Sequence, residues 1–296
     1  MFMRSVTAFA SLPPLGRFLW TTAGFLPASL GGKSVLRKFI RRYRGTKFQA
    51  RVIRGFDFSG EIGDSVDNRI ATDLDFEPAL SDFIAGTAGE FETFLDIGCN
   101  VGWFSCLVGA LPGSPKTIVS VDANPSMVRA CEANMALNGF RTIGLVRALG
   151  PENGTITFYI PERRHSRASI GKPNTEKFGD TKAIEVEMVP LGDVLQRFPG
   201  GRCDLIKMDI EGYELEVLRT VPTATILQVG RIVLEYTRSN LEGCGFGGMT
   251  LGVLPWLEHF TVESLSEDGV IRKVADPAGY SPHETTFILT NRSRPI

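Results

Sequence analysis

The sequence predicts an α/β protein whose central sheet is doubly wound and mostly parallel. From about residue 90 onward, short apolar segments of strand length alternate with segments of helical periodicity, which is the order of strand–helix–strand units. Several apolar segments contain almost no polar residue, as expected for strands that are buried on both faces. The first of them ends in a glycine-rich turn, at the place where a parallel sheet binds its ligands.

The individual elements follow from periodicity and from turn residues. We predict core strands in FETFLDIG (91–98), KTIVSVDAN (116–124), RTIGLVRALG (141–150), CDLIKMDIEG (203–212) and RIVLEYT (231–237). The intervening WFSCLVGAL, PSMVRACEANMALNG and ELEVLRTV have helical spacing. TITFYI (155–160) and AIEVEMVP (183–190) alternate in period two, which predicts antiparallel strands flanking a polar loop. HFTVESLS and ETTFILTN, with no obvious helix between them, predict an antiparallel hairpin at the sheet edge.

The charge distribution divides the chain in two. Residues 1–55 contain eight Arg, three Lys and no acid, whereas residues 56–296 contain 21 basic and 33 acidic residues. No apolar run within residues 1–55 approaches the roughly 18 residues of a spanning helix. The spacing within SVLRKFIRRY predicts a basic amphipathic helix that lies on an anionic membrane or on a partner, or that packs on the domain with solvated charges. We therefore predict a basic helical extension over 1–55 and a catalytic domain over 56–296.

Cysteine usage and net charge limit the class of protein. The five cysteines are scattered without metal-ligand spacing, which is typical of reduced cysteines in a cytoplasmic protein. Only three histidines occur, and none lies near a cysteine pair, so we expect no structural zinc. The net charge of -1 argues against a general affinity for nucleic acid. We expect a cytoplasmic protein, with peripheral contact at the inner face of a membrane as a further expectation for the basic extension.

The glycine turn D-I-G-C-N-V-G lies at the end of the first core strand. It has Trp-Phe where a phosphate-binding loop needs Lys-Ser/Thr, and its Gly98 and Gly102 do not form a dinucleotide fingerprint. A carboxylate inside the turn, Asp96, would also repel a pyrophosphate. A cofactor with positive charge and no phosphate tolerates that acid, and S-adenosylmethionine carries a sulfonium and an ammonium group. A purely structural turn remains the alternative.

An acid at the end of the second strand supports the same cofactor. Asp122 follows Gly98 by about two dozen residues, and a carboxylate there can accept hydrogen bonds from both ribose hydroxyls. The turn and the acid together, in this order and spacing, are considerably more specific than either alone.

Three charges cluster at the end of the fourth core strand, in K-M-D-I-E-G. Strand alternation places Lys207 and Asp209 on one face, and Glu211 follows in the turn before a helix. In a structural interpretation, Lys207 pairs with Asp209, while Glu211 and Glu214 favour the helix N-terminus. Buried charges are costly unless they are paired or used, so a role at the ligand site is the competing interpretation.

These segments together resemble the FkbM-type S-adenosylmethionine-dependent methyltransferases. The resemblance covers roughly residues 76–235, and its most specific element is K-M-D-I-E-G-x-E. It implies the class I methyltransferase (Rossmann-like) fold, with a seven-stranded sheet and an antiparallel last strand. It also implies O-methylation of a hydroxyl on a sugar, glycolipid or natural product. The Glu77-Pro78 pair resembles a Glu-Pro of the family to which no clear role attaches.

The resemblance also implies roles for individual cofactor-site residues. Asp96, Gly98, Asn100 and Gly102 would line the methionine part of the cofactor. Asp122 would hold the ribose, with Ala123 and Asn124 beside the adenosine, and Arg147 and Ala148 would face the adenine. The family more often has Glu-Pro after the second strand, so D-A-N-P departs mildly from it, although the acid is retained.

For the chemistry, we expect a small-molecule or glycan acceptor and no metal. Asp209 or Glu211 would accept the hydroxyl proton or orient the hydroxyl, and Lys207 would fix a carboxylate or the developing oxyanion. Glu235, in V-L-E-Y, is a further candidate carboxylate. These acids would alternatively hold a divalent cation. Rival functions are an NAD(P)-dependent oxidoreductase or epimerase and a non-catalytic membrane scaffold. The acceptor would lie against residues 161–180, where His165 is a minor candidate base, and 244–249.

Overall fold

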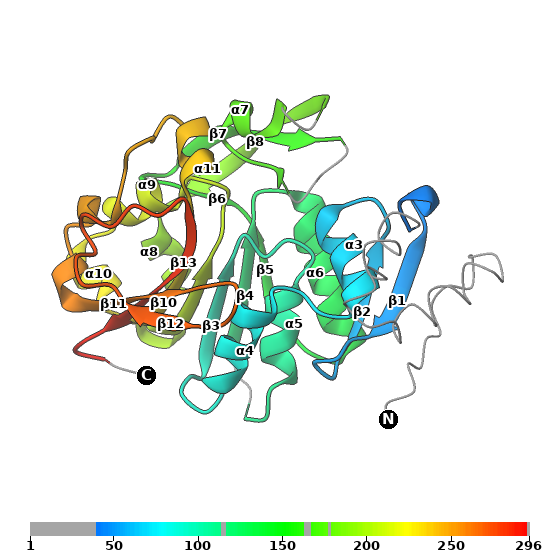
Figure 1. Ribbon diagram of the computed structural model, residues 1–296, viewed down its shortest axis with the longest axis horizontal. Helices are drawn as coiled ribbons and strands as arrows, with labels where there is room; N and C mark the ends of the chain where they lie inside the picture. The colour runs from blue at the N-terminus through cyan, green and yellow to red at the C-terminus, as the bar shows by residue number, and fades with distance from the viewer. Residues whose placement is uncertain (1–39, 114–116, 163–166, 177–178, 295–296) are drawn as a thin grey trace.

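The computed structural model describes residues 40–113, 117–162, 167–176 and 179–294. Its centre is an eight-stranded sheet in the order β5-β4-β3-β9-β10-β13-β11-β12 (Figure 1). The five strands from β5 to β10 in this order are parallel to one another, and β13 runs antiparallel to both β10 and β11. The strands are β3 Thr93–Ile97, β4 Thr117–Asp122, β5 Ile143–Val146, β9 Cys203–Met208, β10 Val229–Thr237, β11 Phe260–Leu265, β12 Ile271–Lys273 and β13 Glu284–Asn291.

This topology confirms the predicted fold class. The doubly wound, mostly parallel sheet is present, and its last long strand is antiparallel. The prediction of seven strands omits only β12, a three-residue edge strand that pairs with β11. Because β12 is exposed at all three positions, it has no buried face from which period-two alternation would arise.

Helices cover both faces of the sheet, and strand alternation explains the two resulting cores. On one face, Phe94, Leu205 and Val233 pack against α3 Ser65–Asp73, α4 Pro78–Gly86, α5 Trp103–Ala110 and α6 Pro125–Leu137. On the other face, Leu95, Ile206 and Leu234 pack against α8 Leu191–Leu195, α9 Glu214–Arg219 and α10 Thr223–Ile226. Successive strand residues therefore point to opposite cores, and this burial on both faces accounts for the almost uniformly apolar strands.

The first described residues form a β-hairpin rather than a helix. A short 3-10 turn, η2 Arg41–Tyr43, is followed by β1 Lys47–Arg51 and β2 Asp57–Glu61. The side chains of Asn134 and Asn138 on α6 hydrogen bond with the backbone of β2. The predicted boundary at residue 55 thus falls within the turn of a hairpin that packs on the domain. Most of the predicted basic helix, like the rest of residues 1–39, lies outside the described residues.

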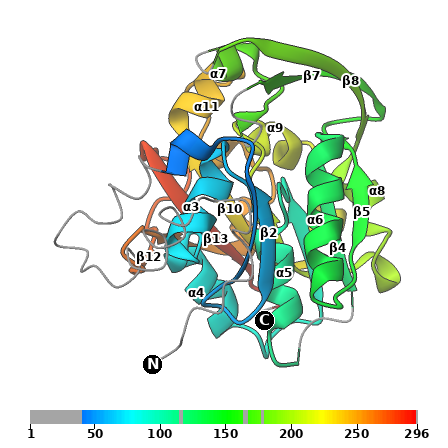
Figure 2. The same cartoon turned by 90° about the vertical axis from the view of Figure 1, so that its right-hand side faces the viewer.

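A second, smaller sheet carries the segment between the third and fourth predicted core strands. It consists of β6 Ala148–Leu149, β7 Gly154–Pro161 and β8 Thr181–Val189. β7 and β8 pair antiparallel, as predicted, and they project with α7 Lys172–Glu176 beyond the main sheet (Figure 2). This sheet places the described part of residues 161–180 next to α11 Arg238–Gly243. No helix within the described ranges is long and apolar enough to cross a membrane.

Candidate active site

The glycine turn after β3 is shaped by close backbone contacts. Gly98 has a φ of +72°, and a Cβ atom there would lie 1.7 Å from the carbonyl oxygen of Asp209. Gly102 has a φ of +84°, and its Cβ would lie 2.7 Å from Sγ of Cys131. Both positions therefore exclude a side chain, and Gly98 brings the turn directly against the end of β9. Asn100 adopts a positive φ of 49° without being glycine, which is a strained conformation.

Asp122 connects this turn with the end of β4. Its carboxylate accepts hydrogen bonds from the backbone N–H of Asn100, at 3.0 Å, and of Asn124, at 2.8 Å. Burial raises the pKa of Asp122 to about 6, although both hydrogen bonds favour the ionised form. Asn124 in turn caps α6 by accepting from the N–H of Ser126. The acid therefore orders both loops at the place where the ribose is predicted.

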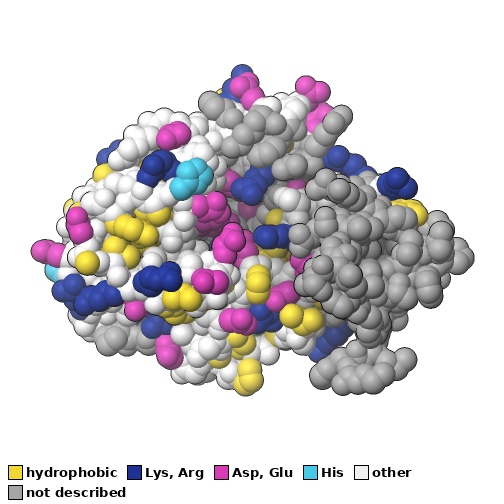
Figure 3. Space-filling view, in the orientation of Figure 1, with side chains coloured by type: hydrophobic (Ala, Val, Ile, Leu, Met, Phe, Trp, Pro, Cys, Tyr) yellow, Lys and Arg dark blue, Asp and Glu magenta, His cyan; other side chains and the backbone are white. Residues whose placement is uncertain are grey.

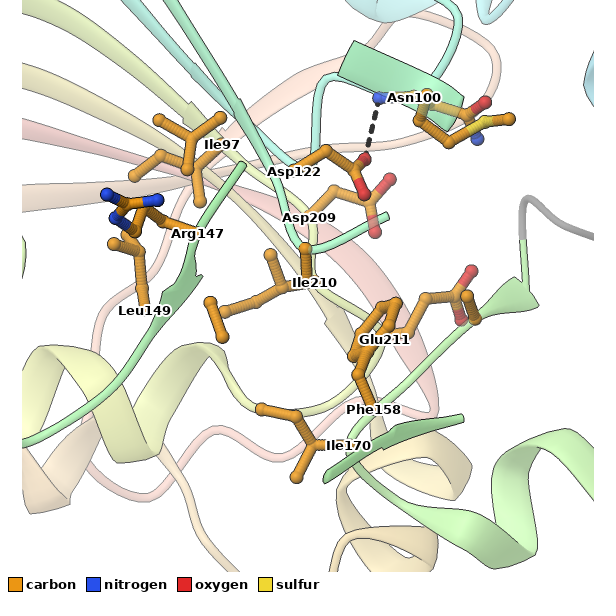
Figure 4. A pocket seen from close by; sticks show the side chains of 16 residues that line it. Ile97, Asn100, Asp122, Arg147, Leu149, Phe158, Ile170, Asp209, Ile210 and Glu211 are labelled. Carbon is orange, nitrogen blue, oxygen red and sulfur yellow. Dashed lines mark hydrogen bonds between the residues drawn. The ribbon is translucent and has the colours of Figure 1, made fainter. Parts of the chain in front are cut away.

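A cleft opens at these strand ends, with apolar walls and polar groups at its edges. Figure 4 shows Ile97, Leu149, Phe158, Ile170 and Ile210 around it, with Asp122 and Asn100 together at one end. Six of the nine predicted cofactor residues line this cleft: Gly98, Asn100, Asp122, Ala123, Arg147 and Ala148. The guanidinium of Arg147 is held by Glu187 at 3.0 Å and by the carbonyl of Val146 at 2.7 Å. Flat apolar walls beside an acid suit a nucleoside.

The other three predicted cofactor residues lie behind the cleft. Gly102 begins α5, and Asn124 is buried at the start of α6. Asp96 is fully buried and accepts a hydrogen bond from Ser105 at 2.7 Å. Burial raises the pKa of Asp96, while Lys207 and Ser105 act in the opposite direction. Asp96 is therefore a supporting residue beneath the turn rather than part of the cleft lining.

Lys207 is the buried cation of the site. Its Nζ atom donates to the carbonyl of Gly98 at 3.1 Å and lies 3.5 Å from Asp209 and 3.9 Å from Asp96. The ammonium also lies over the Phe104 ring, 5.4 Å from its centroid. Burial alone would lower the pKa of Lys207, but four carboxyl groups raise it above its ordinary value. These groups are Asp209, Asp96, Glu77 and Glu235.

Glu211 is held by the protein on both carboxylate oxygens. Arg167 lies 3.1 Å from one oxygen and 3.2 Å from the other, and Asn240 donates to the second at 2.7 Å. The backbone carbonyl of Glu211 accepts from Ser169 and Asn174, both in the β7–β8 excursion. Burial and Asp209 raise the pKa of Glu211 to about 8, while Arg167 lowers it. Glu211 thus anchors the excursion and α11 to the end of β9.

Glu214 has the structural role that the sequence offered as an alternative. Its carboxylate accepts from the N–H of Ile210 at 2.7 Å and from the N–H of Gly212 at 3.0 Å. It therefore closes the turn that precedes α9, and burial raises its pKa to about 7.

Asp209 and Glu235 form the second charged group of the site. Asp209 follows β9, and its side chain is 27% exposed, the most accessible among the residues paired with Lys207. Glu235 lies on the neighbouring strand β10, and the closeness of Asp209, a hydrogen bond between the two carboxyl groups, and burial together raise its pKa well above the ordinary value. The neighbouring negative charge of Asp209 therefore favours the protonated form of Glu235. In Figure 3, acidic side chains gather near the middle of the molecular face.

Glu77 belongs to the same surroundings, although the sequence suggested no role for it. It directly precedes α4, far from β9 and β10 in sequence, yet Asp209 and Lys207 are among the charges that shift its pKa. Glu77 also contributes to the raised pKa of Glu235. The Glu-Pro resemblance was the one signal that pointed to it. His165 lies outside the described residues, and the described part of the chain contains no group of three Cys, His, Asp or Glu placed to hold a metal ion.

Comparison with known proteins identifies the family of this chain. A family model described as the methyltransferase FkbM domain matches residues 96–264, more than half of the chain. The methyltransferase sdnD of Sordaria araneosa is 27% identical over 228 residues, which cover 67% of this chain and 80% of that protein.

Solved structures show weaker similarity. An O-methyltransferase from Bacillus cereus in complex with SAH has 10% identity and a TM-score of 0.38, with 73% of this chain and 83% of that chain covered. A methyltransferase FkbM from Methylobacillus flagellatus KT has 11% identity and a TM-score of 0.36, with 88% and 60% covered. The family assignment therefore rests on the family model.

Proposed function

The chain belongs to the family of methyltransferase FkbM domains, and from this premise we propose that it methylates a hydroxyl group of a sugar, glycolipid or natural product with S-adenosylmethionine. We propose a hydroxyl group as the methyl acceptor because two carboxyl groups, those of Asp209 and Glu235, lie beside the cleft. A neutral hydroxyl must lose a proton when it is methylated, and a carboxylate within reach can accept it.

The cleft supports this cofactor through three kinds of group. Asp122 would accept hydrogen bonds from the ribose hydroxyls, and apolar side chains such as Leu149 and Phe158 would pack on the adenine. The backbone of Gly98 and Asn100 would face the methionine part, since the missing side chain at Gly98 permits close approach. S-adenosylmethionine, when bound, supplies the methyl group.

Asp209 is the group that we assign as general base. Its carboxylate accepts the proton of the acceptor hydroxyl as the oxygen forms its bond to the methyl carbon. Lys207 positions Asp209, since its Nζ atom lies 3.5 Å from that carboxylate, and Glu235 lies beside Asp209. Glu211 is less suited to this task because Arg167 and Asn240 occupy its oxygens. Alignment of the acceptor oxygen with the methyl group supplies the rest of the acceleration.

The experiment compares the unmodified chain with Asp209→Asn. Both are incubated with S-adenosylmethionine and a small-molecule and glycolipid extract of the source cells, and products heavier by one CH2 group are sought by mass spectrometry. We expect the rate to fall about 10²–10⁴-fold in Asp209→Asn, which is the usual contribution of a general base. The dissociation constant of S-adenosylhomocysteine, measured by calorimetry, should stay within about threefold. Asp193→Asn, at an exposed position in α8, is the control.

Two results would contradict the proposal. Full turnover by Asp209→Asn would remove Asp209 as the base. Binding of NADH without binding of S-adenosylhomocysteine would instead indicate an oxidoreductase.

A further inference from the structure

Glu77 has a backbone conformation that is unfavourable for two separate reasons. Its φ of 42° and ψ of 66° lie in the left-handed region, which side chains other than glycine rarely occupy. It also precedes Pro78, and a residue before proline is normally pushed toward extended conformations. A sequence free to relax would place glycine here, so the surrounding structure must impose this conformation on Glu77.

The residues on either side of Glu77 are fixed by contacts from three elements. Arg54, from the β1–β2 turn, binds both oxygens of Asp75 at 2.9 Å. Ser81 in α4 donates to the carbonyl of Phe76 at 2.8 Å and accepts from Trp103 at 3.0 Å. The ring of Phe76 packs edge-on against Trp103 and Phe104 of α5. These contacts hold the strained residue between two immobile neighbours.

The carboxyl group of Glu77 lies close enough to Asp209 and Lys207 for their charges to shift its pKa. Burial raises its pKa to about 7, Asp209 raises it further, and the cations Lys207, Arg69 and Arg167 lower it. Within the described part of the chain, the Glu77 carboxyl group has no hydrogen-bond or ion-pair partner. The Glu77 side chain is half-buried, so a hydrogen-bond donor from a ligand can reach its unpaired carboxylate oxygens.

The neighbouring charges indicate which donor fits. Lys207 is already occupied by Asp209, Asp96 and the carbonyl of Gly98, and Arg167 is paired with Glu211. Among the described residues, Glu77 and Glu235 have no such cation partner. Both lie close enough to Asp209 for its charge to raise their pKa values. An anionic acceptor would be repelled there, whereas hydroxyl groups would donate to the carboxylates.

We propose that Glu77 binds the acceptor, accepting hydrogen bonds from hydroxyl groups of an uncharged, polyhydroxylated molecule next to the hydroxyl that Asp209 deprotonates. This assignment rests on the proposed methyl transfer and adds both a binding residue and the charge class of the acceptor.

The test uses the full chain, methyl-labelled S-adenosylmethionine and an extract of the source cells separated by ion exchange into neutral, anionic and cationic pools. We expect label in the neutral pool. Glu77→Gln should reduce transfer at limiting amounts of the neutral pool by about tenfold or more, the equivalent of one hydrogen bond to a charged group. Raising the amount of the pool should restore much of the rate, and S-adenosylhomocysteine affinity should stay within about twofold. Glu258→Gln, exposed and remote in η6 Leu257–His259, is the matched control.

Glu77→Gly separates a binding role from a structural one. Glycine tolerates the left-handed region, so this variant should keep or raise the melting temperature while it loses transfer to the neutral pool. A lower melting temperature together with lost transfer would indicate a structural role and overturn the proposal. Unchanged transfer by Glu77→Gln, loss of S-adenosylhomocysteine affinity in that variant, or label only in a charged pool would also overturn it. Absence of label in every pool with the unmodified chain would overturn the proposed methyl transfer, and this assignment with it.

Discussion

The cofactor side and the acceptor side of the site are built in different ways. The predicted cofactor residues come from one continuous stretch within residues 96–149, and Phe158, Ile170 and Ile210 complete the apolar wall of their cleft. The acceptor side is assembled from the residue before α4, the turn after β9, the end of β10 and the β7–β8 excursion. Its charged members are Glu77, Lys207, Asp209, Glu211, Glu235 and Arg167.

The two sides also differ in how their acids are stabilised. Asp122, on the cofactor side, accepts two backbone hydrogen bonds and organises two loops. On the acceptor side, Glu77 and Glu211 both have positive φ values, and burial and neighbouring carboxyl groups raise their pKa values. Strain and buried charge are therefore concentrated on the side that we expect to select the acceptor, as is usual where function opposes stability.

Lys207 belongs to both sides, so its removal should have the largest effect on the protein. Lys207→Met would leave the buried Asp96 and the half-buried Asp209 without their cation. We expect the free energy of unfolding at pH 7.5 to fall by about 3–5 kcal/mol, the usual cost of breaking a buried pair. Denaturant titration measures this change, with Lys182→Met at an exposed position of β8 as the control. The loss should be smaller near pH 5, where carboxyl groups take up protons; a loss below about 1 kcal/mol at pH 7.5 would contradict the assignment.

A substitution at Asp122 should affect the cofactor side without affecting the acceptor side. In Asp122→Ala, the dissociation constant of S-adenosylhomocysteine should rise about 10–100-fold, because hydrogen bonds to a charged group are worth roughly 1.5–3 kcal/mol. The rate at saturating cofactor and acceptor should largely recover, which is the opposite of the pattern expected for Asp209→Asn. Calorimetry and saturation kinetics distinguish the two patterns. A rate that stays low at saturating cofactor would show that Asp122 also acts on the acceptor side.

The pH dependence of stability tests three buried acids of the site together. The pKa values of Glu77, Glu211 and Glu214 are raised from 4.5 to about 7, 8 and 7, respectively. Between about pH 4.5 and 8 the folded chain therefore binds more protons than the unfolded chain, and the free energy of unfolding should decrease as the pH rises.

We expect a continuous decrease in the free energy of unfolding across that window, measured by denaturant titration at several pH values. The double variant Glu77→Gln/Glu211→Gln should flatten the profile. If the free energy of unfolding of the unmodified chain instead increased with pH through the same window, the raised pKa values of these acids would be wrong.

The sequence by itself determined the features that depend on neighbours along the chain. Period-two and helical spacing gave the strand–helix order, and the antiparallel pairing of β7 with β8 followed from alternation. Gly98, Asn100 and Asp122 could be placed in the cleft because each lies at the carboxyl end of a core strand, where a parallel sheet binds its ligands. The hairpin of β1 and β2 escaped prediction because the basic residues of 41–54 dominate its composition.

Only the tertiary structure decided which role each acidic residue of the site has. Asp209 and Glu211 are two residues apart and equivalent as candidates in the sequence, yet Arg167 and Asn240 occupy only Glu211. Asp96 is buried beneath the turn because Ser105 and Lys207 converge on it. Which carboxyl group keeps its oxygens free depends on partners that are tens of residues away, and contacts of that kind leave no periodicity in the sequence.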